Sequence, residues 1–244
     1  MLMPVGDDNS DRRIKPLINY LFIAANIFVF VFFQGMGTNE IFTYSFSTVP
    51  AEIISGKDIV TEDQIYEDPS TGDKYKATGL QPTPISVYIT LLTSMFMHGG
   101  LAHLFGNLLY LWIFGDNIEN RIGHLRYLIF YLLCGVIASL AHVFTSVLFE
   151  SNLLIPSLGA SGAISGVLGG YIMLFPKRRV RVIMLYRLTE VPALVAIGIW
   201  FVFQLISGIG MLGSDQGGVA YGAHIGGFIA GIFLVKFFTI GKRN

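Results

Sequence analysis

The chain has 244 residues, of which 53% are hydrophobic and 13% are charged, whereas a typical soluble domain carries about 25% charged residues. The mean hydropathy of +0.62 excludes a water-facing surface throughout and predicts a membrane protein with several spans. The net charge is zero, so the charge balance indicates no nucleic-acid partner.

Six charge-free runs mark the expected spans, because a membrane-crossing helix needs about 20 consecutive apolar residues. In chain order they cover residues 16–39, 77–115, 127–149, 151–176, 191–214 and 216–235. The second run is nearly twice as long as a span needs, so we expect only residues 100–115 to cross, with the preceding part at the interface. We predict an all-α polytopic membrane protein: a short cytoplasmic segment 1–15, a membrane domain 16–240 and a short cytoplasmic tail 241–244.

The basic residues predict the orientation of these spans. If the N-terminus is cytoplasmic, only Lys57, Lys74 and Lys76 fall on the outer side, and the other 13 of the 16 Lys and Arg residues fall on the cytoplasmic side. This asymmetry favours two cytoplasmic termini. We interpret the basic run KRRVR, residues 177–181, as part of this orientation signal rather than as a lipid-specific site.

The first outer loop, about residues 35–86, is long and acidic. Within it, the sequence IYEDPSTGDKYKA, residues 65–77, places turn-forming residues between two short polar and aromatic runs, which predicts a small exposed hairpin. The single cysteine, Cys134, lies in an apolar run and is expected to be a buried, inert thiol.

The polar side chains within the spans gather at one depth. The second, fourth and sixth spans all run from outside to inside, and His103, Asn107, Ser161 and His224 lie near their outer ends. Polar groups at membrane depth are costly unless they are paired, so these residues are functional candidates. The other polar residues that we noted in or near the spans are His98, His142 and Ser165.

Each candidate also has a simpler interpretation. Ser161, within the GASG sequence at 159–162, could be a small packing residue, and His142 is expected to be one. His103 and Asn107 are four residues apart and share a helix face, which suits either stabilisation of an oxyanion or a hydrogen bond between helices. A metal site formed by His98, His103 and His224 is weakly supported, because no carboxylate accompanies them.

Rows of small residues suggest how Ser161 could reach His224. The fourth span has glycines at 162, 166 and 170, and the sixth has small residues at 222, 226 and 230, with Gly227 and Gly231 beside them. Small residues at every fourth position let two helix backbones approach closely. If these two rows face each other, Ser161 and His224 meet within side-chain reach.

Together, GASG at 159–162, HLFGN at 103–107 and AHIGGFIAG at 223–231 resemble the rhomboid family of intramembrane serine proteases. The sequence GDNIENRIG, residues 115–123, is similar to the family's cytoplasmic Glu-x-Arg segment, here Glu119 and Arg121. The resemblance implies a six-transmembrane-helix rhomboid-like bundle. It also implies a Ser-His dyad in which Ser161 is the nucleophile and His224 the general base.

In the same resemblance, His103 and Asn107 stabilise the oxyanion, and no metal or cofactor is needed. The implied partners are transmembrane protein substrates, cleaved within the lipid bilayer near its outer face. The implied location is a bacterial plasma (inner) membrane. One departure concerns the fourth position after the nucleophile, where family members commonly carry an aromatic residue that packs on the catalytic histidine and this chain has Ser165.

Two alternatives belong to other classes of function. A catalytically inactive rhomboid-like chaperone or adaptor would lose the dyad, both members of which are present here. A small-solute transporter would place polar groups through both halves of the membrane, whereas the candidates cluster in the outer half.

Overall fold

The computed structural model describes residues 2–67, 72, 74–210 and 220–241. The expected limits of the fifth and sixth spans at 214 and 216, and all of the expected tail except Gly241, lie outside these residues. The bundle consists of α1 (Leu17–Phe28), α5 (Leu101–Tyr110), α6 (Asp116–Ile122), α7 (His124–Leu148), α8 (Ser161–Leu174), α9 (Ala193–Gly210) and α10 (Tyr221–Thr239). Short helices at one end are α2 (Glu40–Ser45), α3 (Pro50–Ser55) and α4 (Thr90–Thr93).

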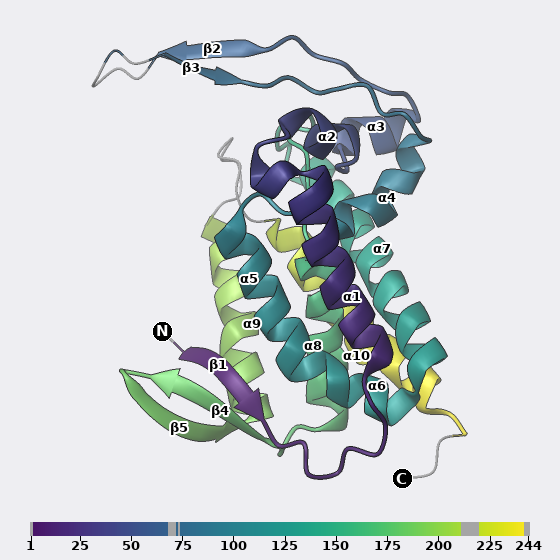
Figure 1. The fold of residues 1–244 in the computed structure, drawn as a ribbon, viewed down its shortest axis with the longest axis vertical. Coiled ribbons are helices and arrows are strands. Elements are labelled where there is room, and N and C mark those ends of the chain that lie inside the picture. Colours follow the sequence, from purple (N-terminus) through teal and green to yellow (C-terminus); the bar gives the residue numbers. More distant parts are fainter. Residues whose placement is uncertain (1, 68–71, 73, 211–219, 242–244) are drawn as a thin grey trace.

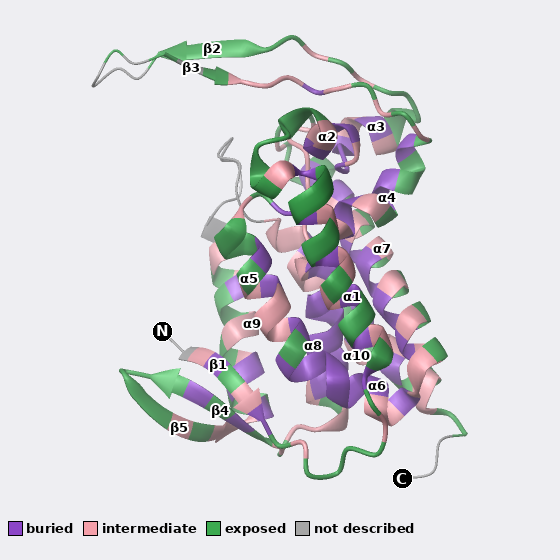
Figure 2. Ribbon diagram, viewed as in Figure 1, coloured by how far each residue is buried: buried purple, intermediate pink, exposed green. Residues whose placement is uncertain are grey.

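α8 is the central helix of this bundle. Every residue from Gly162 to Tyr171 is buried, and Figures 1 and 2 show α8 within the bundle, among the other long helices. A helix buried on all sides must be apolar or small on every face, and the sequence SGAISGVLGGYIML meets this requirement. Its first residue, Ser161, lies at the end of the bundle that carries α2, α3 and α4.

The long helices differ in whether their length and composition suit a membrane crossing. Among the described residues, α7 and α10 are long and apolar enough to span a membrane. A third candidate is the pair Val87–Phe96 and Leu101–Ile122, which is bent by 81°. The remaining apolar helices are shorter: Leu17–Phe33, in which a π-helical turn extends α1, Ser161–Leu174, and the Ala193–Gly208 part of α9.

The helix that contains the second expected crossing extends beyond residue 115. Gly100 precedes the first residue of α5, after the 81° bend, but the helix continues through a π-helical turn at Leu111–Gly115 into α6 and ends at Ile122. The helix is therefore longer than the crossing expected at residues 100–115, and the limits of that crossing stay a prediction. Charged residues extend the helix here because they are paired: Arg12 bonds to Asp116, and Glu119 accepts hydrogen bonds from the first turn of α1.

Glu119, which the family resemblance singled out, is a capping residue for α1. Its two carboxylate oxygens lie 2.9 Å from the backbone nitrogen of Ile18 and 2.8 Å from that of Asn19, and it also bonds to His124. The first N–H groups of a helix have no partner within the helix. The buried carboxylate supplies one for two of them and complements the positive end of the helix dipole.

The expectation of an all-α fold is too narrow. At the end of the bundle opposite the short helices, a three-stranded antiparallel sheet has the order β1-β4-β5, formed by β1 (Leu2–Asp7), β4 (Arg179–Met184) and β5 (Arg187–Pro192). The sequence RVRVIM alternates charged and apolar residues, and Val180 and Val182 are buried while Arg179 and Arg181 are exposed. This period of two is a strand signal. Its basic residues also carry the orientation signal.

The hairpin expected in the outer loop is confirmed for its two strands. β2 (Gln64–Glu67) pairs antiparallel with β3 (Lys74–Ala77), with Gln64 opposite Ala77 and Glu67 opposite Lys74. Its turn, at 68–73, lies outside the described residues except for Gly72. Figure 1 shows the hairpin projecting sideways from the end that carries α2 and α3.

The rows of small residues pack, but not in the expected pairing. A Cβ atom built on Gly231 would lie 1.9 Å from the carbonyl oxygen of Gly166, and one on Gly227 would lie 2.2 Å from that of Gly162. These two glycines of α10 therefore face α8. A Cβ atom on Gly226 would lie 2.2 Å from that of Ala141 on α7, so this row faces a different helix.

The glycines of α8 likewise pack against α7 as well as α10. A Cβ atom on Gly162 would lie 2.7 Å from that of Ala138, and one on Gly166 would lie 2.4 Å from that of Cys134. Cys134 is fully buried, as expected. Three helices thus meet at one junction, because two adjacent rows of small residues on α10 let α8 and α7 approach at the same time.

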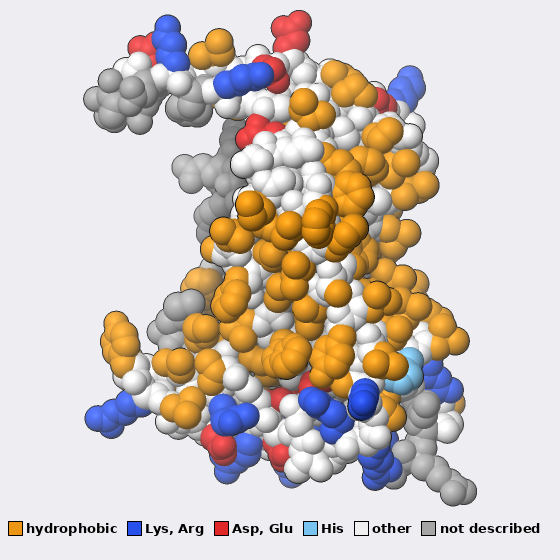
Figure 3. Space-filling view, in the orientation of Figure 1, with side chains coloured by type: hydrophobic (Ala, Val, Ile, Leu, Met, Phe, Trp, Pro, Cys, Tyr) orange, Lys and Arg blue, Asp and Glu red, His pale blue; other side chains and the backbone are white. Residues whose placement is uncertain are grey.

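Figure 3 shows hydrophobic side chains around the middle of the molecule and charged ones at its two ends. Lys and Arg gather mainly at the end that carries β1, β4 and α6. An apolar belt between two polar ends is the surface expected of a chain embedded in a bilayer.

Candidate active site

Ser161 is placed by the glycines on either side of it. Gly159 has a φ of +124°, a conformation that favours glycine, and its N–H donates to the carbonyl oxygen of Ser94 over 2.8 Å. A Cβ atom on Gly159 would also lie 2.8 Å from the ring of His103. Gly162 lets α7 approach on the other side. The glycines of GASG therefore bring Ser161 close to two other helices at the first residue of α8.

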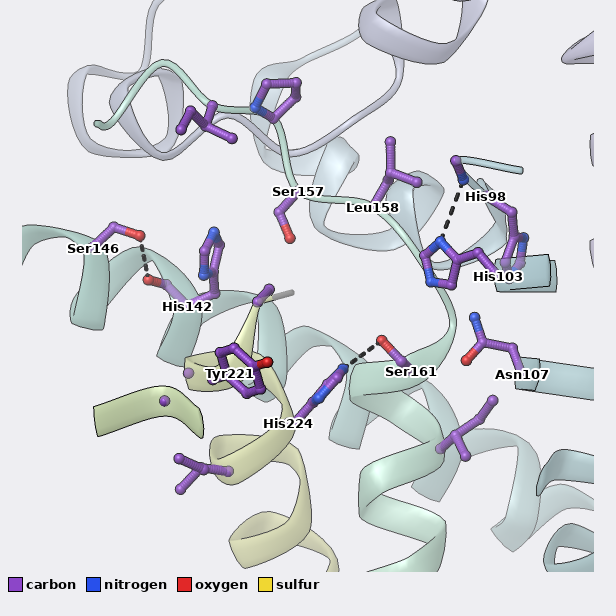
Figure 4. A pocket seen from close by; sticks show the side chains of 18 of the residues that line it. His98, His103, Asn107, His142, Ser146, Ser157, Leu158, Ser161, Tyr221 and His224 are labelled. Atoms are coloured by element: carbon purple, nitrogen blue, oxygen red, sulfur yellow. Dashed lines mark hydrogen bonds between the residues drawn. The ribbon is translucent and has the colours of Figure 1, made fainter. Parts of the chain in front are cut away.

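His224, in the first turn of α10, meets Ser161 as expected. Its Nε2 lies 2.8 Å from the Ser161 Oγ (Figure 4). Its Nδ1 lies 2.7 Å from the Oε1 of Gln204 on α9. A glutamine carbonyl oxygen can only accept a hydrogen bond, so the Nδ1 carries the proton and the Nε2 is left to accept the hydroxyl proton of the serine.

Gln204 did not emerge from the sequence reasoning. It is buried, at 7% exposure, and is the one amide side chain in the charge-free run 191–214. That isolation was the available signal, because a polar group at membrane depth needs a partner. The partner could not be identified, since Gln204 and His224 lie 20 residues apart on different helices.

His103 and Asn107 lie one turn apart on α5, and Figure 4 shows both on the side of Ser161 opposite His224. The Nδ1 of His103 accepts the N–H of Gly99 over 3.3 Å, which leaves its Nε2 to carry the proton and donate. The Nδ2 of Asn107 is buried and makes no hydrogen bond to a described residue. A buried donor without a partner is costly, and here it lies beside the serine.

The remaining candidates have other environments. The ring of His98 is fully buried, lies 5.2 Å from that of His103, and forms no hydrogen bond to a described residue, while its backbone bonds twice to Gln34. Ser165 donates its hydroxyl to the carbonyl of Ser161 over 2.6 Å. The described part of the chain holds no group of three His, Cys, Asp or Glu side chains able to bind a metal.

Aromatic rings from other positions flank His224 in place of a residue at 165. The ring of Trp200 on α9 lies 6.1 Å from the imidazole, and that of Tyr221, at the start of α10, lies 6.4 Å from it in an edge-on arrangement. The imidazole is therefore oriented by α9 and by its own helix.

A cavity of about 910 Å³ is lined by the four candidate residues His103, Asn107, Ser161 and His224. The helices α5, α7, α8, α9 and α10 all contribute to its wall, and Figure 4 shows His142 on α7 on the same side of Ser161 as Tyr221. Among the described residues that line the cavity, Glu40 is the one acid, and its carboxylate bonds to Thr78 rather than to a histidine. The cavity offers a hydroxyl, an imidazole and several hydrogen-bond donors to a polar substrate group.

Comparison with known proteins identifies related sequences. Residues 86–240 match a family model described as Rhomboid domain. The chain is 30% identical over 237 residues to Rhomboid protease GluP of Bacillus subtilis, covering 94% of this chain and 37% of that protein. It is 31% identical over 155 residues to Rhomboid protein 1, mitochondrial, of Saccharomyces cerevisiae, covering 63% of this chain and 42% of the relative.

A human relative is also detected. The chain is 32% identical over 156 residues to the human Presenilin-associated rhomboid-like protein, mitochondrial, covering 60% of this chain and 37% of that protein. The chain thus spans less than half the length of each of these relatives. The matched region 86–240 contains all four of His103, Asn107, Ser161 and His224.

Proposed function

Since the chain belongs to the rhomboid family, we propose that it is an intramembrane serine endopeptidase that uses Ser161 and His224 as a catalytic dyad. The observation that carries the proposal is the 2.8 Å contact between the Ser161 Oγ and the His224 Nε2, within a cavity lined by unused hydrogen-bond donors. The members of the family are integral membrane proteins, and the substrates would be transmembrane segments of other proteins.

In the proposed reaction, the His224 Nε2 takes the hydroxyl proton as the Ser161 oxygen attacks a peptide carbonyl carbon. The carbonyl oxygen becomes an oxyanion, stabilised by the Asn107 Nδ2–H, the His103 Nε2–H and the N–H of Ser161 at the positive end of α8. The histidine then gives its proton to the leaving amine, and the C–N bond breaks. Attack by water on the resulting ester releases the acid and restores the hydroxyl.

A helical substrate must unwind locally before this attack, because its carbonyl groups are engaged in helical hydrogen bonds. Transmembrane segments weakened by Gly or Pro are therefore the expected substrates. The position of Ser161 at the outer end of α8 favours cleavage near the outer face. The six crossings, the cytoplasmic termini and a bacterial plasma membrane are part of the proposal, supported by the charge-free runs and by the basic end of the molecule in Figure 3.

Labelling with a serine-reactive fluorophosphonate in detergent, followed by mapping of the modified residue, tests the proposal. We expect the label on Ser161 and its loss in Ser161→Ala. The Ser165→Ala variant is the matched control, because that hydroxyl is engaged with a backbone carbonyl in the same helix, and it should keep most of the label. A folded protein that takes no label would instead favour the inactive chaperone or adaptor.

A further inference from the structure

We propose that Gln204 on α9 is a positioning residue that holds His224 in its productive tautomer and so supports the dyad of Ser161 and His224. This inference rests on the proposed function. It is carried by a 2.7 Å contact between the Oε1 of the buried Gln204 and the His224 Nδ1, on the side of the imidazole away from Ser161.

The contact decides which ring nitrogen carries the proton. A neutral imidazole has one N–H and one lone pair. The carbonyl oxygen of Gln204 binds the N–H at Nδ1, which leaves the Nε2 lone pair facing the Ser161 hydroxyl. With the opposite tautomer, the Nε2–H would donate to the serine oxygen and the imidazole could not act as its base. The partner of the second nitrogen thus selects the active form of a catalytic histidine.

The packing of α9 against α10 fixes this partner in place. The ring of Phe201 stacks on that of Phe228 with centroids 4.1 Å apart and planes within 18°. Phe228 is one turn beyond His224 on α10, and Phe201 lies in the turn before Gln204 on α9. The stacked rings therefore fix the position of α9 along α10, which places Gln204 beside the imidazole. Trp200, one turn before Gln204 on the same face, adds the ring contact to His224.

An amide suits this position better than a carboxylate in a membrane. An ionised acid at that depth is expensive, whereas a neutral amide accepts the same hydrogen bond without a charge. The other titratable side chains among the described residues that line the cavity are three histidines, three tyrosines and one acid: His98, His103, His142, Tyr44, Tyr110, Tyr221 and Glu40, which bonds to Thr78. None of them is hydrogen-bonded to the Nδ1, so the role falls to Gln204.

The first test compares Gln204→Met and Gln204→Glu with wild type across pH. Methionine keeps the length of the side chain but removes the acceptor, so kcat should fall by about 10- to 100-fold with little change in KM. Glutamate restores an acceptor that can ionise and stabilise the imidazolium, so most of the activity should return and the acidic limb of the pH profile should move to higher pH. The matched control is Ile206→Met, an exposed position two residues along α9, which should leave kcat and the limb unchanged.

A role in packing alone would lower activity in both variants without moving the acidic limb. That outcome, or wild-type kinetics in Gln204→Met, would overturn the assignment.

The second test reads the tautomer directly and does not depend on proteolysis. In protein labelled with ¹⁵N-histidine, the ¹⁵N shifts of His224, assigned with a His224→Gln variant, should report a proton on Nδ1 in wild type and a mixture in Gln204→Met. A wild-type protein that takes no fluorophosphonate but shows this change would refute the protease and keep the positioning role. If the fluorophosphonate labels Ser161 and the His224 tautomer is the same in wild type and Gln204→Met, the protease is supported and the positioning role is refuted.

Discussion

After the proposed dyad of Ser161 and His224, Asn107 is the most informative residue of the candidate site. Its buried Nδ2 lacks a partner among the described residues, although folding normally pairs such groups. An enzyme can bear this cost if the donor gains its partner when the oxyanion forms. The loss of one such donor typically lowers kcat by about 10²–10³-fold, and we expect this loss in Asn107→Ala.

Measurement of kcat and KM separately checks this expectation, because a transition-state donor affects kcat and spares KM. The matched control is Asn26→Ala, another buried helical asparagine, which bonds to a backbone carbonyl of α1 and does not line the cavity. Its kcat should stay near the wild-type value. A raised KM with an unchanged kcat in Asn107→Ala would make Asn107 a substrate-binding residue instead.

Asp7, at the end of β1, gives the stability of the three-stranded sheet a pH dependence. Burial raises the pKa of its carboxyl to about 6, although Tyr171 and Asn117 donate to its Oδ2 over 2.6 and 2.7 Å. An ordinary aspartate in the unfolded chain titrates near ~3.9. The folded state therefore holds this proton more tightly, and the stabilisation is complete below about pH 4 and is lost as the pH rises through about 6.

The Asp7→Asn variant should lack this component. A pKa difference of about 2 corresponds to about 3 kcal/mol, so between pH 4 and pH 7 the stability of wild type should fall relative to that of the variant by up to this amount. Thermal unfolding of both proteins in detergent at the two pH values measures the difference and cancels the titration of the other groups. If the stability of wild type and of Asp7→Asn changed equally between the two pH values, the pKa of Asp7 would be ordinary.

Individual site residues could be predicted where the sequence places several polar groups at one depth. His103, Asn107, Ser161 and His224 were found in this way, and the structure brings them to one cavity. Gln204 could not be, because an isolated amide in an apolar run indicates only that it needs a partner. The partner depends on how α9 packs on α10, which is a property of the folded bundle.

Helices that touch through glycine respond sharply to added side chains. Gly227 faces the backbone of Gly162, next to Ser161, so Gly227→Val should push α10 away from α8 by an ångström or more. Misplacement on that scale costs about 10²-fold in rate. Valine is apolar, so membrane insertion should persist.

Activity and expression of this variant are compared with those of Gly198→Val on α9, where a new Cβ atom would meet nothing within 4 Å. The control should stay active. A fully active Gly227→Val protein would mean that the contact between α8 and α10 does not position the dyad.

The pairing of these helices illustrates a limit of sequence patterns. The spacing of four identified rows of small residues correctly, but α10 carries two adjacent rows, and nothing in the sequence states which helix each one faces. The structure assigns Gly227 and Gly231 to α8 and Gly226 to α7. The predicted meeting of Ser161 and His224 was right although the predicted pairing of the rows was wrong.

The whole chain is expected to thread the membrane with its basic end in the cytoplasm. An impermeant maleimide applied to intact cells should therefore label Lys57→Cys and fail to label Lys177→Cys until the cells are opened. Both lysines are exposed, and the native Cys134 is fully buried and should give no background. Equal labelling of the two variants in intact cells would refute the orientation.

The overall plan could be predicted because charge-free runs and basic clusters reflect the bilayer itself. Charge-free runs do not indicate where a helix ends, since the helix that begins at Leu101 continues past residue 115 once Asp116 and Glu119 find partners on the N-terminal segment. The sheet was not predicted either, because it also depends on contacts between segments that are distant in the sequence. Its β1 is six residues of the N-terminus, which become a strand only because β4 lies beside them.

The pairing of β1 with β4 also has a consequence for the order of synthesis. Leu2 pairs with Met184, so after synthesis β1 must wait for a partner about 180 residues later, on the order of 10–40 s at about 5–20 residues per second. Until then its edge is open to wrong partners. Pro4 removes one backbone donor, and the acidic Asp7 and Asp8 at its end keep it solvated. β1 is thus made well before the strand that pairs with it, so the sheet can close only after the chain from α1 to α8 has been synthesised.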